Sequence, residues 1–292
     1  MIWISDAWKD YEVLDTSNGE RLERWGKYIL VRPDPQVIWN TPHTAKEWKK
    51  YDARYVRSNT GGGRWTDHDL PERWQIRYKD YLTFNVKPMN FKHTGVFPEQ
   101  AANWDFIRDT VAQASVQRPV RVLNLFAYSG GATLAAAAGG AEVFHVDASK
   151  GMVAWAKENA QASGLADRKI HWIVDDCAKF IQREIRRGRK YDGIIMDPPS
   201  YGRGPSGEIW KMETSFFPFL EETAKILSDD PLFVIINSYT TGLAPSAVSY
   251  AADVVFGSKY GGKCVAGELG LPVKSSGLML PCGATGRWTP NK

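Results

Sequence analysis

Cysteine is scarce in this sequence of 292 residues, with only three copies, Cys177, Cys264 and Cys282. They form no Cys-x-x-Cys pair, so neither a structural zinc site nor a disulfide framework is predicted, and we expect no metal. No stretch approaches the roughly 20 apolar residues that cross a membrane. The first residues also lack the basic and apolar segments of a secretion signal. These absences favour a cytoplasmic protein with no membrane partner.

A strong excess of one charge sign is also missing, because the net charge at neutral pH is only +4. This mild basicity is compatible with nucleic-acid binding but does not indicate it. One dense basic cluster occurs, from Lys179 to Lys190. It predicts either a contact with RNA or a solvated helix face whose cations lie near the negative end of the helix.

The first 90 residues differ in composition from the rest and hold seven of the twelve tryptophans. Short alternating runs at residues 28–32, 36–39 and 74–78 are separated by Pro, Gly, Asn and Asp. This pattern is typical of short antiparallel strands. We therefore expect a small β-rich accessory domain over residues 1–90, which is a candidate for substrate recognition.

From residue 91 onward, predicted strands and helices alternate. The strands are expected at residues 121–126, 142–147, 169–174, 191–196 and 232–238, and the helices at 101–117, 132–138, 150–163, 177–187 and 214–227. Such alternation produces right-handed crossovers and a mainly parallel sheet. Two last strands, at 263–271 and 277–288, predict an antiparallel C-terminal edge. The expected fold is a Rossmann-like, doubly wound α/β domain over residues 91–292 with a seven-stranded sheet.

The turn after the first of these strands, Ala127-Tyr-Ser-Gly-Gly131, has little steric cover and opens a helix. Its spacing is not Gly-x-Gly-x-x-Gly, so a dinucleotide pyrophosphate is not predicted there. This also argues against a nicotinamide dehydrogenase. A wider turn of this kind suits the amino-acid part of S-adenosylmethionine. The alternative is a tight turn that binds nothing.

Carboxylates follow the next two strands. Asp147 ends the second strand, where a carboxylate can accept hydrogen bonds from ribose hydroxyls or cap the following helix. Asp176 ends the third strand and is predicted to accept the adenine amino group, while the next backbone amide, that of Cys177, meets the ring. Helix capping is again the alternative for Asp176.

The fourth strand ends in Asp197-Pro-Pro-Ser-Tyr201. Two prolines fix φ and remove two amide donors, so the strand cannot continue and the chain is held open beside the ligand crevice. Asp197 and Pro198 are predicted to face the reacting group, and Tyr201 to stack on a flipped base. These three are the predicted catalytic residues. The alternative is an ordinary turn at the end of a strand.

Together these motifs resemble class I S-adenosylmethionine-dependent methyltransferases, and more narrowly the bacterial large-subunit (23S) ribosomal RNA methyltransferases. The upstream segment Lys92-His-Thr-Gly-Val-Phe-Pro-Glu-Gln100 also matches that family's pattern. The resemblance implies methylation of a ribosomal RNA base, with S-adenosylhomocysteine as the product of the cofactor. The cofactor site it implies consists of Phe91, Lys92, Thr94, Phe97, Ala127, Tyr128, Ser129, Gly130, Asp147, Ala148, Ser149, Asp176, Cys177 and Asp197.

One departure from the family narrows the chemistry. Its cytosine-5 members carry a nucleophilic cysteine just after the fifth strand, where this sequence has Ile236-Asn-Ser-Tyr-Thr240. Methylation of cytosine C5 requires a thiolate that adds to C6 of the base. A nitrogen target is therefore favoured. Two alternatives stay open, namely a methyltransferase for a small molecule or a protein, and a non-enzymatic factor for RNA binding or assembly.

Overall fold

The computed structural model describes residues 1–58, 62–66, 69–203 and 209–291. The chain divides into two compact units. The first comprises Met1–Trp3, Asn103–Glu268 and Gly283–Lys292, and the second comprises Ile4–Ala102 and Leu269–Cys282. Each unit thus combines segments that are far apart in the sequence. The functional division at residue 90 stays a prediction.

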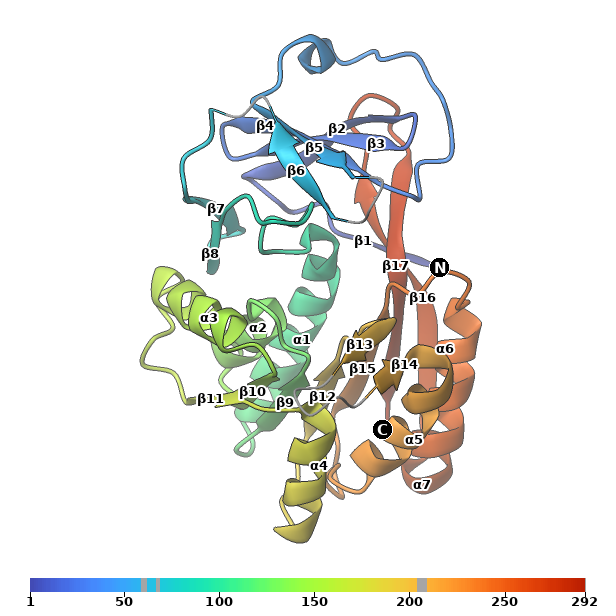
Figure 1. Cartoon of the computed structure of the whole chain (residues 1–292). Helices are drawn as coiled ribbons and strands as arrows, with labels where there is room; N and C mark the ends of the chain where they lie inside the picture. The colour runs from blue at the N-terminus through green and yellow to red at the C-terminus, as the bar shows by residue number, and fades with distance from the viewer. Residues whose placement is uncertain (59–61, 67–68, 204–208, 292) are drawn as a thin grey trace. The chain divides into compact units, whose positions relative to one another are not determined.

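The first unit is built on an eight-stranded sheet with the order β1-β16-β17-β15-β12-β9-β10-β11 (Figure 1). Its strands are β1 (Ile2–Ile4), β9 (Arg121–Leu125), β10 (Glu142–Asp147), β11 (Ile170–Val174), β12 (Gly193–Met196), β15 (Phe233–Ser238), β16 (Lys263–Pro272) and β17 (Met279–Thr289). Strands β9 to β12 and β15 pair in parallel, whereas β17 pairs antiparallel with β15. The predicted fold class is confirmed, and β1 adds an eighth strand to the seven expected.

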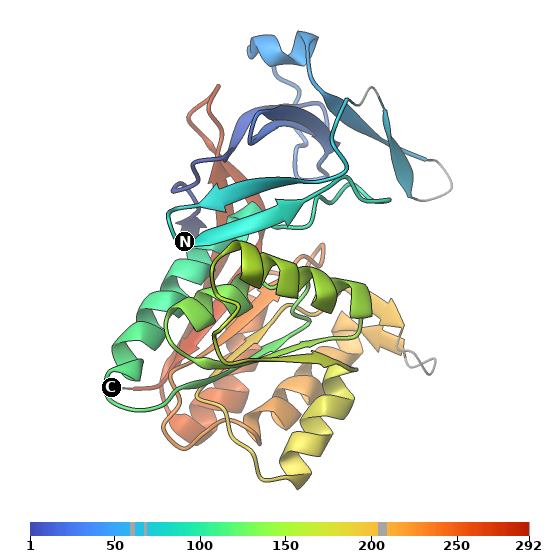
Figure 2. The same ribbon diagram turned by 90° about the vertical axis from the view of Figure 1, so that its left-hand side faces the viewer.

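Helices cover both faces of this sheet, and Figure 2 shows α1 to α3 in green on one side and the yellow to orange helices on the other. Their bounds are α1 (Ala101–Ser115), α2 (Gly131–Ala138), α3 (Lys150–Ala162), α4 (Cys177–Arg186), α5 (Met212–Ala224), α6 (Pro245–Ala252), the π-helical turn η3 (Asp253–Gly257) and α7 (Ser258–Tyr260). Alternate strand residues such as Leu123 and Ile194 pack into one buried cluster with Phe180 of α4 and Leu220 of α5. Among the described residues, no helix combines the length and apolar character that crossing a membrane requires.

The second unit contains a five-stranded sheet and a separate hairpin. The sheet consists of β2 (Tyr11–Ser17), β3 (Glu20–Trp25), β4 (Tyr28–Pro33), β5 (Ala53–Arg57) and β6 (Gly63–Thr66), and the hairpin of β7 (Trp74–Tyr78) and β8 (Leu82–Val86). Short 3-10 helices, η1 (Lys46–Lys49) and η2 (Pro98–Gln100), complete the unit. The predicted small N-terminal sheet is confirmed.

The strand predicted at residues 36–39 is wrong. Asp34 Oδ1 accepts a hydrogen bond from Gln36 N at 3.0 Å, and Asp34 O accepts one from Val37 N at 3.1 Å. These bonds close an aspartate turn immediately after β4. Local side-chain hydrogen bonding therefore outweighs the strand preference of the apolar residues that follow.

Candidate active site

The turn between β9 and α2 carries backbone strain. Phe126 and Tyr128 have φ angles of 55° and 51°, in the left-handed region that disfavours residues with a Cβ. Gly130 follows with a φ of 90°. Such conformations persist only where the surroundings hold them, and they cluster at functional sites. The turn predicted to meet the cofactor is thus a fixed and strained segment.

Two glycines allow α2 to begin in a crowded place. A Cβ on Gly130 would lie 3.0 Å from the Cβ of Ala156. A Cβ on Gly131 would lie 2.5 Å from the ring of Trp104. The backbone of the turn therefore packs directly against α1 and α3.

Asp147, at the end of β10, holds the strained turn through its side chain. Its Oδ2 accepts a hydrogen bond from Tyr128 N and its Oδ1 accepts one from Ser149 N, both at 2.8 Å. Burial raises the pKa of Asp147, and these two hydrogen bonds oppose that rise. The N-cap of α3 is Ser149, so the capping alternative for Asp147 does not hold. A carboxylate offers about four lone-pair sites, which leaves two for the hydroxyls of a ligand.

Buried polar groups anchor the turn from beneath. Asn159 of α3 donates to Ser129 O at 2.9 Å. Asn124 Nδ2 donates to Thr133 Oγ1 at 2.9 Å, and Thr133 Oγ1 lies 2.9 Å from His145 Nδ1. Burial lowers the pKa of His145 to about 3, so this ring is neutral. The network fixes the start of α2 without placing a charge there.

Asp176 and Cys177 begin α4. Asp176 is the N-cap, and its Oδ1 accepts a hydrogen bond from Lys179 N at 2.9 Å, so the capping role is observed. Its contact with adenine stays a prediction. The Sγ of Cys177 accepts a hydrogen bond from Phe126 N at 3.3 Å, and burial raises the pKa of this thiol. Its side chain supports the turn, while its backbone amide lies in the first helical turn, where amides lack helical acceptors.

The Asp-Pro-Pro turn lies beside the strained turn at the carboxyl end of β12. Asp197 N donates to Leu125 O at 3.4 Å. Ser200 Oγ lies 2.8 Å from Thr240 Oγ1, which ties the turn to the segment after β15. A short hairpin of β13 (Tyr201–Arg203) and β14 (Ile209–Lys211) follows, and Tyr201 is 52% exposed on it.

Three aromatic rings join the two turns. Phe126 lies 5.6 Å from Trp210 and 5.6 Å from Phe219, and these two lie 5.4 Å apart. Trp210 Nε1 also donates to Pro199 O at 2.6 Å. Sequence reasoning did not identify Phe126, Trp210 or Thr240, because their partners are distant in the chain. The structure gathers at one sheet edge most of the predicted residues, namely Ala127, Tyr128, Ser129, Gly130, Asp147, Ala148, Ser149, Asp176, Cys177, Asp197, Pro198 and Tyr201.

The other predicted cofactor residues lie in the second unit, between β8 and η2. Lys92 Nζ donates to Pro33 O at 3.2 Å, and burial lowers its pKa to about 8. Thr94 is fully buried, and its Oγ1 has no hydrogen-bond partner among the described residues. Phe91 is 59% exposed, and the ring of Phe97 lies 5.2 Å from that of His93. Their part in the cofactor site stays a prediction.

A buried ion pair supports this segment. Arg32 donates to both carboxylate oxygens of Glu23, at 2.5 and 2.7 Å, and to Lys92 O at 3.1 Å. Burial opposes the charge on Glu23, but Arg21 and Arg32 hold its pKa at about 2. Arg32 therefore links the core of the five-stranded sheet to the backbone at Lys92.

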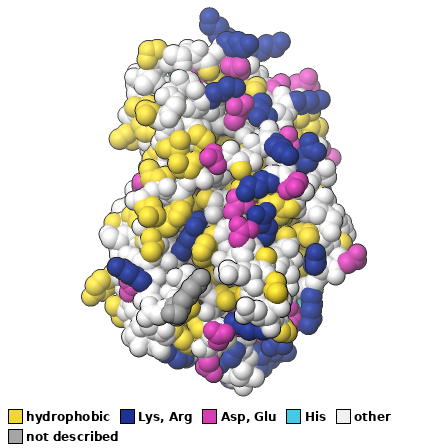
Figure 3. Space-filling view, turned by 180° about the vertical axis from the view of Figure 1, so that it is seen from behind, with side chains coloured by type: hydrophobic (Ala, Val, Ile, Leu, Met, Phe, Trp, Pro, Cys, Tyr) yellow, Lys and Arg dark blue, Asp and Glu magenta, His cyan; other side chains and the backbone are white. Residues whose placement is uncertain are grey.

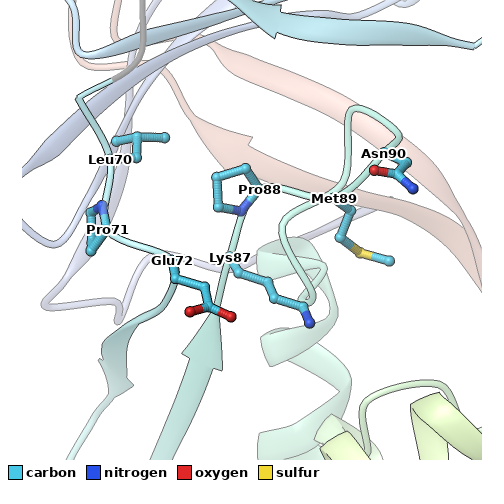
Figure 4. A pocket seen from close by; sticks show the side chains of 7 residues that line it. All are labelled: Leu70, Pro71, Glu72, Lys87, Pro88, Met89 and Asn90. Carbon is cyan, nitrogen blue, oxygen red and sulfur yellow. The ribbon is translucent and has the colours of Figure 1, made fainter.

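The second unit also contains a hollow of about 450 Å³ between residues 70–72 and 87–90. It is lined by Leu70, Pro71, Glu72, Lys87, Pro88, Met89 and Asn90 (Figure 4). Figure 4 shows the Glu72 and Lys87 side chains extending toward the same side of the hollow. Apolar walls with a few polar groups are typical of ligand pockets of this size. Within the described part of the chain, no group of three His, Cys, Asp or Glu residues could hold a metal ion.

The sheet order, the strained turn and the carboxylates beside it define a Rossmann-like α/β protein built to bind a nucleoside-type ligand. The family model for S-adenosylmethionine-dependent methyltransferases matches residues 23–211. The chain belongs to this family, which confirms the predicted class of enzyme and its cofactor, S-adenosylmethionine. The chemistry of the edge fits this cofactor, since Asp147 retains acceptor sites for hydroxyls and α4 presents amides from its first turn.

Among curated proteins, the chain is similar to several ribosomal RNA methyltransferases. It is 29% identical over 196 residues to ribosomal RNA large subunit methyltransferase K/L of Shewanella frigidimarina. These residues make up 66% of this chain but only 24% of that protein. It is 33% identical over 132 residues to ribosomal RNA large subunit methyltransferase K of Neisseria meningitidis. These residues make up 44% of this chain and 37% of that protein. The chain thus spans well under half the length of these relatives, and the predicted resemblance is confirmed.

Solved structures of methyltransferases are similar over more of the chain. A SAM-dependent methyltransferase from Agrobacterium tumefaciens is 37% identical with a TM-score of 0.93, covering 100% of this chain and 94% of that one. SMU.776, complexed with S-adenosylhomocysteine, is 19% identical with a TM-score of 0.70, covering 96% and 76% of the two chains. The similarity to SMU.776 shows a shared fold only.

Proposed function

We propose that this protein methylates a base of ribosomal RNA in the cytoplasm, and that the target is a nitrogen atom. The names of the curated relatives support the substrate class. The observation that carries the proposal is the Asp-Pro-Pro turn held beside the strained turn, through Asp197 N on Leu125 O and through the Phe126, Trp210 and Phe219 rings.

The absence of a reactive thiol at this edge supports a nitrogen target over cytosine C5. Cys177 is the cysteine at the edge, and burial raises its pKa while its Sγ accepts a hydrogen bond from the turn. The end of β15 offers Ser238 and the segment after it offers Thr240, and their hydroxyls are weak nucleophiles at neutral pH. A nitrogen with its own lone pair requires no covalent activation by the protein.

In the proposed mechanism, the bound S-adenosylmethionine supplies an electrophilic methyl group on sulfur. Asp147 holds the ribose hydroxyls, Asp176 and the Cys177 amide meet the adenine, and the turn from Ala127 to Gly130 holds the amino-acid part. Phe91, Lys92, Thr94 and Phe97 are further residues that we assign to the cofactor, on the resemblance to the family. Asp197 and Pro198 orient the attacking nitrogen, and Tyr201 stacks on the target base. Alignment and exclusion of water then account for most of the rate.

We further propose that residues 1–90 recognise the substrate. The hollow shown in Figure 4 supports this role, because it combines apolar walls with the Lys87 cation and the Glu72 carboxylate. Such a site can hold a planar base by its faces and its polar edge.

Two measurements test the function. Mass spectrometry of ribosomal RNA nucleosides, with and without the gene, should reveal one methylated base that disappears in its absence. S-adenosylhomocysteine should raise the melting temperature of the purified protein, because a ligand that binds only the folded state stabilises it. Stabilisation by the ligand with unchanged ribosomal RNA would redirect the search to a small-molecule or protein substrate. RNA binding without stabilisation would indicate a non-enzymatic RNA factor.

A further inference from the structure

The amino edge of the sheet, opposite the strained turn, contains a basic hollow that the methyl-transfer site does not use. The hollow has a volume of about 220 Å³ and is lined by residues that begin four neighbouring strands. Arg121 starts β9, Glu142 starts β10, His171 lies in β11, and Arg189 with Lys190 precedes β12. Parallel pairing brings these amino ends together, so segments distant in the sequence form one site.

The inner wall of this hollow is aromatic and rigid. His171 stacks on Phe144 with ring centroids 4.3 Å apart, and Phe144 meets Tyr191 edge to face at 5.1 Å. The Tyr191 hydroxyl donates to Glu184 at 2.6 Å, which fixes the ring. The wall is therefore held in shape before anything binds, and little ordering is needed when a ligand arrives.

The outer part of the hollow is basic. Arg121, Arg189 and Lys190 line it, and Lys169 and Arg187 lie in ion pairs next to it. Arg121 and Lys169 pair with Glu142, Arg187 and Arg189 pair with Glu184, and Lys190 Nζ donates to Lys225 O at 2.6 Å. The surplus of three positive charges compares with a net charge of +4 for the whole chain. Figure 3 shows Lys and Arg side chains lying among Asp and Glu on the face that it draws.

The two carboxylates lie inward and the cations lie outward. Side-chain exposure is 17% for Glu142 and 0% for Glu184, against 68% for Lys169 and 54% for Arg121. Burial opposes the charge on Glu142, but hydrogen bonds from Lys169, His171 and Arg121 hold its pKa at about 2. Glu142 therefore stays ionised and orients its cations, while the outward cationic groups can still meet an anion.

The dipole of α4 explains only part of this cluster. Cations near the last turn of a helix are stabilised by its negative end. Arg187 follows that turn and pairs with Glu184 at 2.9 Å. Arg121 and Lys169, in contrast, come from the starts of strands, where no helix end attracts them. They pair instead with Glu142, so the cluster combines cations at a helix end with cations at strand starts.

We propose that this hollow is a phosphate-binding site for the RNA substrate, separate from the methyl-transfer edge. The proposal rests on the proposed function, because it takes RNA as the substrate. The hollow is smaller than the roughly 300–1,000 Å³ of ordinary ligand pockets, which suits one phosphodiester group. Backbone contacts of this kind position RNA without reading its sequence.

The hollow lies at the opposite end of the strands from the proposed methyl-transfer site. Strand β9 has 5 residues, which places the two edges about 17 Å apart at about 3.3 Å per residue. A contact at that distance binds the substrate and the transition state equally well. Its loss should therefore raise KM and leave kcat nearly unchanged.

The test compares two triple variants with the same change of charge. The first is Lys169→Gln, Arg189→Gln and Lys190→Gln at the hollow. The control is Lys157→Gln, Lys259→Gln and Lys263→Gln, three exposed lysines outside residues 1–90 and outside the hollow. Affinity for protein-free large-subunit ribosomal RNA is measured over a range of salt concentrations. The slope of log affinity against log salt should fall by about 2 for the first variant, since each lost contact contributes about 0.7. The slope for the control variant should fall by less than half as much.

Thermal stabilisation by S-adenosylhomocysteine reports on the fold and the cofactor edge, and it should be the same in all three proteins. Equal slopes in the two variants would overturn the site while leaving the proposed function intact. A wild-type protein that does not bind ribosomal RNA would instead overturn the proposed substrate. Inorganic phosphate serves as a further probe. If it raises the melting temperature of the wild type but not of the hollow variant while the two variants have equal salt slopes for RNA, the hollow is a site for free phosphate and the RNA assignment is wrong.

Discussion

The carboxylate of Asp147 fixes the conformation of the turn that faces the proposed cofactor. It accepts hydrogen bonds from Tyr128 N and Ser149 N, and burial raises its pKa. The same side chain thus stabilises a strained backbone and presents acceptors to a ligand. A substitution of Asp147 should therefore affect the turn and ligand binding more than the stability of the whole fold.

We expect Asp147→Asn to weaken S-adenosylhomocysteine binding by about 10- to 100-fold, because hydrogen bonds to a charged group contribute roughly 1.5–3 kcal/mol.

Burial raises the pKa of Asp147. If the ionised form accepts the ribose hydroxyls, as we propose, wild-type binding should weaken as the pH falls through this raised pKa, earlier than for an ordinary aspartate. Isothermal titration calorimetry from about pH 4 to 8 measures both effects. Unchanged binding by the variant would exclude Asp147 as the ribose ligand.

Gly131→Ala should lower the free energy of unfolding by about 1–3 kcal/mol, the usual cost of overpacking. The reason is the 2.5 Å approach of the added Cβ to the Trp104 ring. Gly151→Ala is the matched control, because a Cβ there meets only Ser149 Oγ at 3.8 Å. Alanine in that helix should be neutral or stabilising by up to about 1 kcal/mol. Denaturant titration of both variants checks this, and equal stabilities would contradict the packing argument.

At this scale, the sequence predicted positions better than conformations. Asp147 and Asp197 follow apolar strands, and that placement alone brings both to one sheet edge. The left-handed φ angles of Phe126 and Tyr128 could not be predicted, because aromatic residues rarely adopt them. The strain there depends on Asp147 and Cys177, which lie far along the chain.

The sequence also predicts some helices and strands and misses others. Helices α1 to α5 were predicted to within three residues because their apolar residues recur with helical spacing. Helix α6 was missed because Pro245–Ala252 contains mostly small residues. Strands β1, β13 and β14 have three residues each, too few to show alternation. Their pairing partners decide their structure.

The paired strands β3 and β4 carry the buried Glu23–Arg32 ion pair, which should make stability depend on pH. The pKa of Glu23 is about 2 in the folded protein, below its usual 4.5. This lowered pKa stabilises the fold above about pH 4.5, and the stabilisation is lost as the pH falls toward 2. The expected loss is about 3–4 kcal/mol, because a pKa lowered from 4.5 to about 2 corresponds to about 1.4 kcal/mol per unit.

Chemical denaturation of the full chain at several pH values measures this loss. Glu23→Gln should flatten the acid limb and lower stability at neutral pH, since it leaves Arg32 buried without its anion. Glu72→Gln, at an exposed position, is the control and should leave the pH profile unchanged. An acid limb that persists in Glu23→Gln would assign the effect to other carboxylates.

Over the whole molecule, the three cysteines provide a test of the target atom. Cys177 and Cys264 are buried, and burial raises the pKa of all three thiols. None is a thiolate at neutral pH, so none is prepared to attack a base.

We therefore expect a variant with Cys177→Ser, Cys264→Ser and Cys282→Ser to retain methyl transfer to RNA. Its stability should decrease, because buried hydroxyls replace thiols that pack as apolar groups. Turnover is measured with radiolabelled methyl groups, and cofactor binding serves as the control. Lost turnover with intact cofactor binding would show that a cysteine acts as nucleophile and would favour cytosine C5.

The segment Leu269–Cys282 belongs to the second unit, while residues on both sides of it belong to the first. Within the second unit, Ser275 donates to Asp15 at 2.6 Å, across 260 positions of sequence. The ribosome adds about 5–20 residues each second. The N-terminal sheet must consequently wait many seconds for this late segment to emerge. Nascent chains would thus expose unfinished strand edges throughout synthesis, and expression yield should depend on the chaperones that shield them.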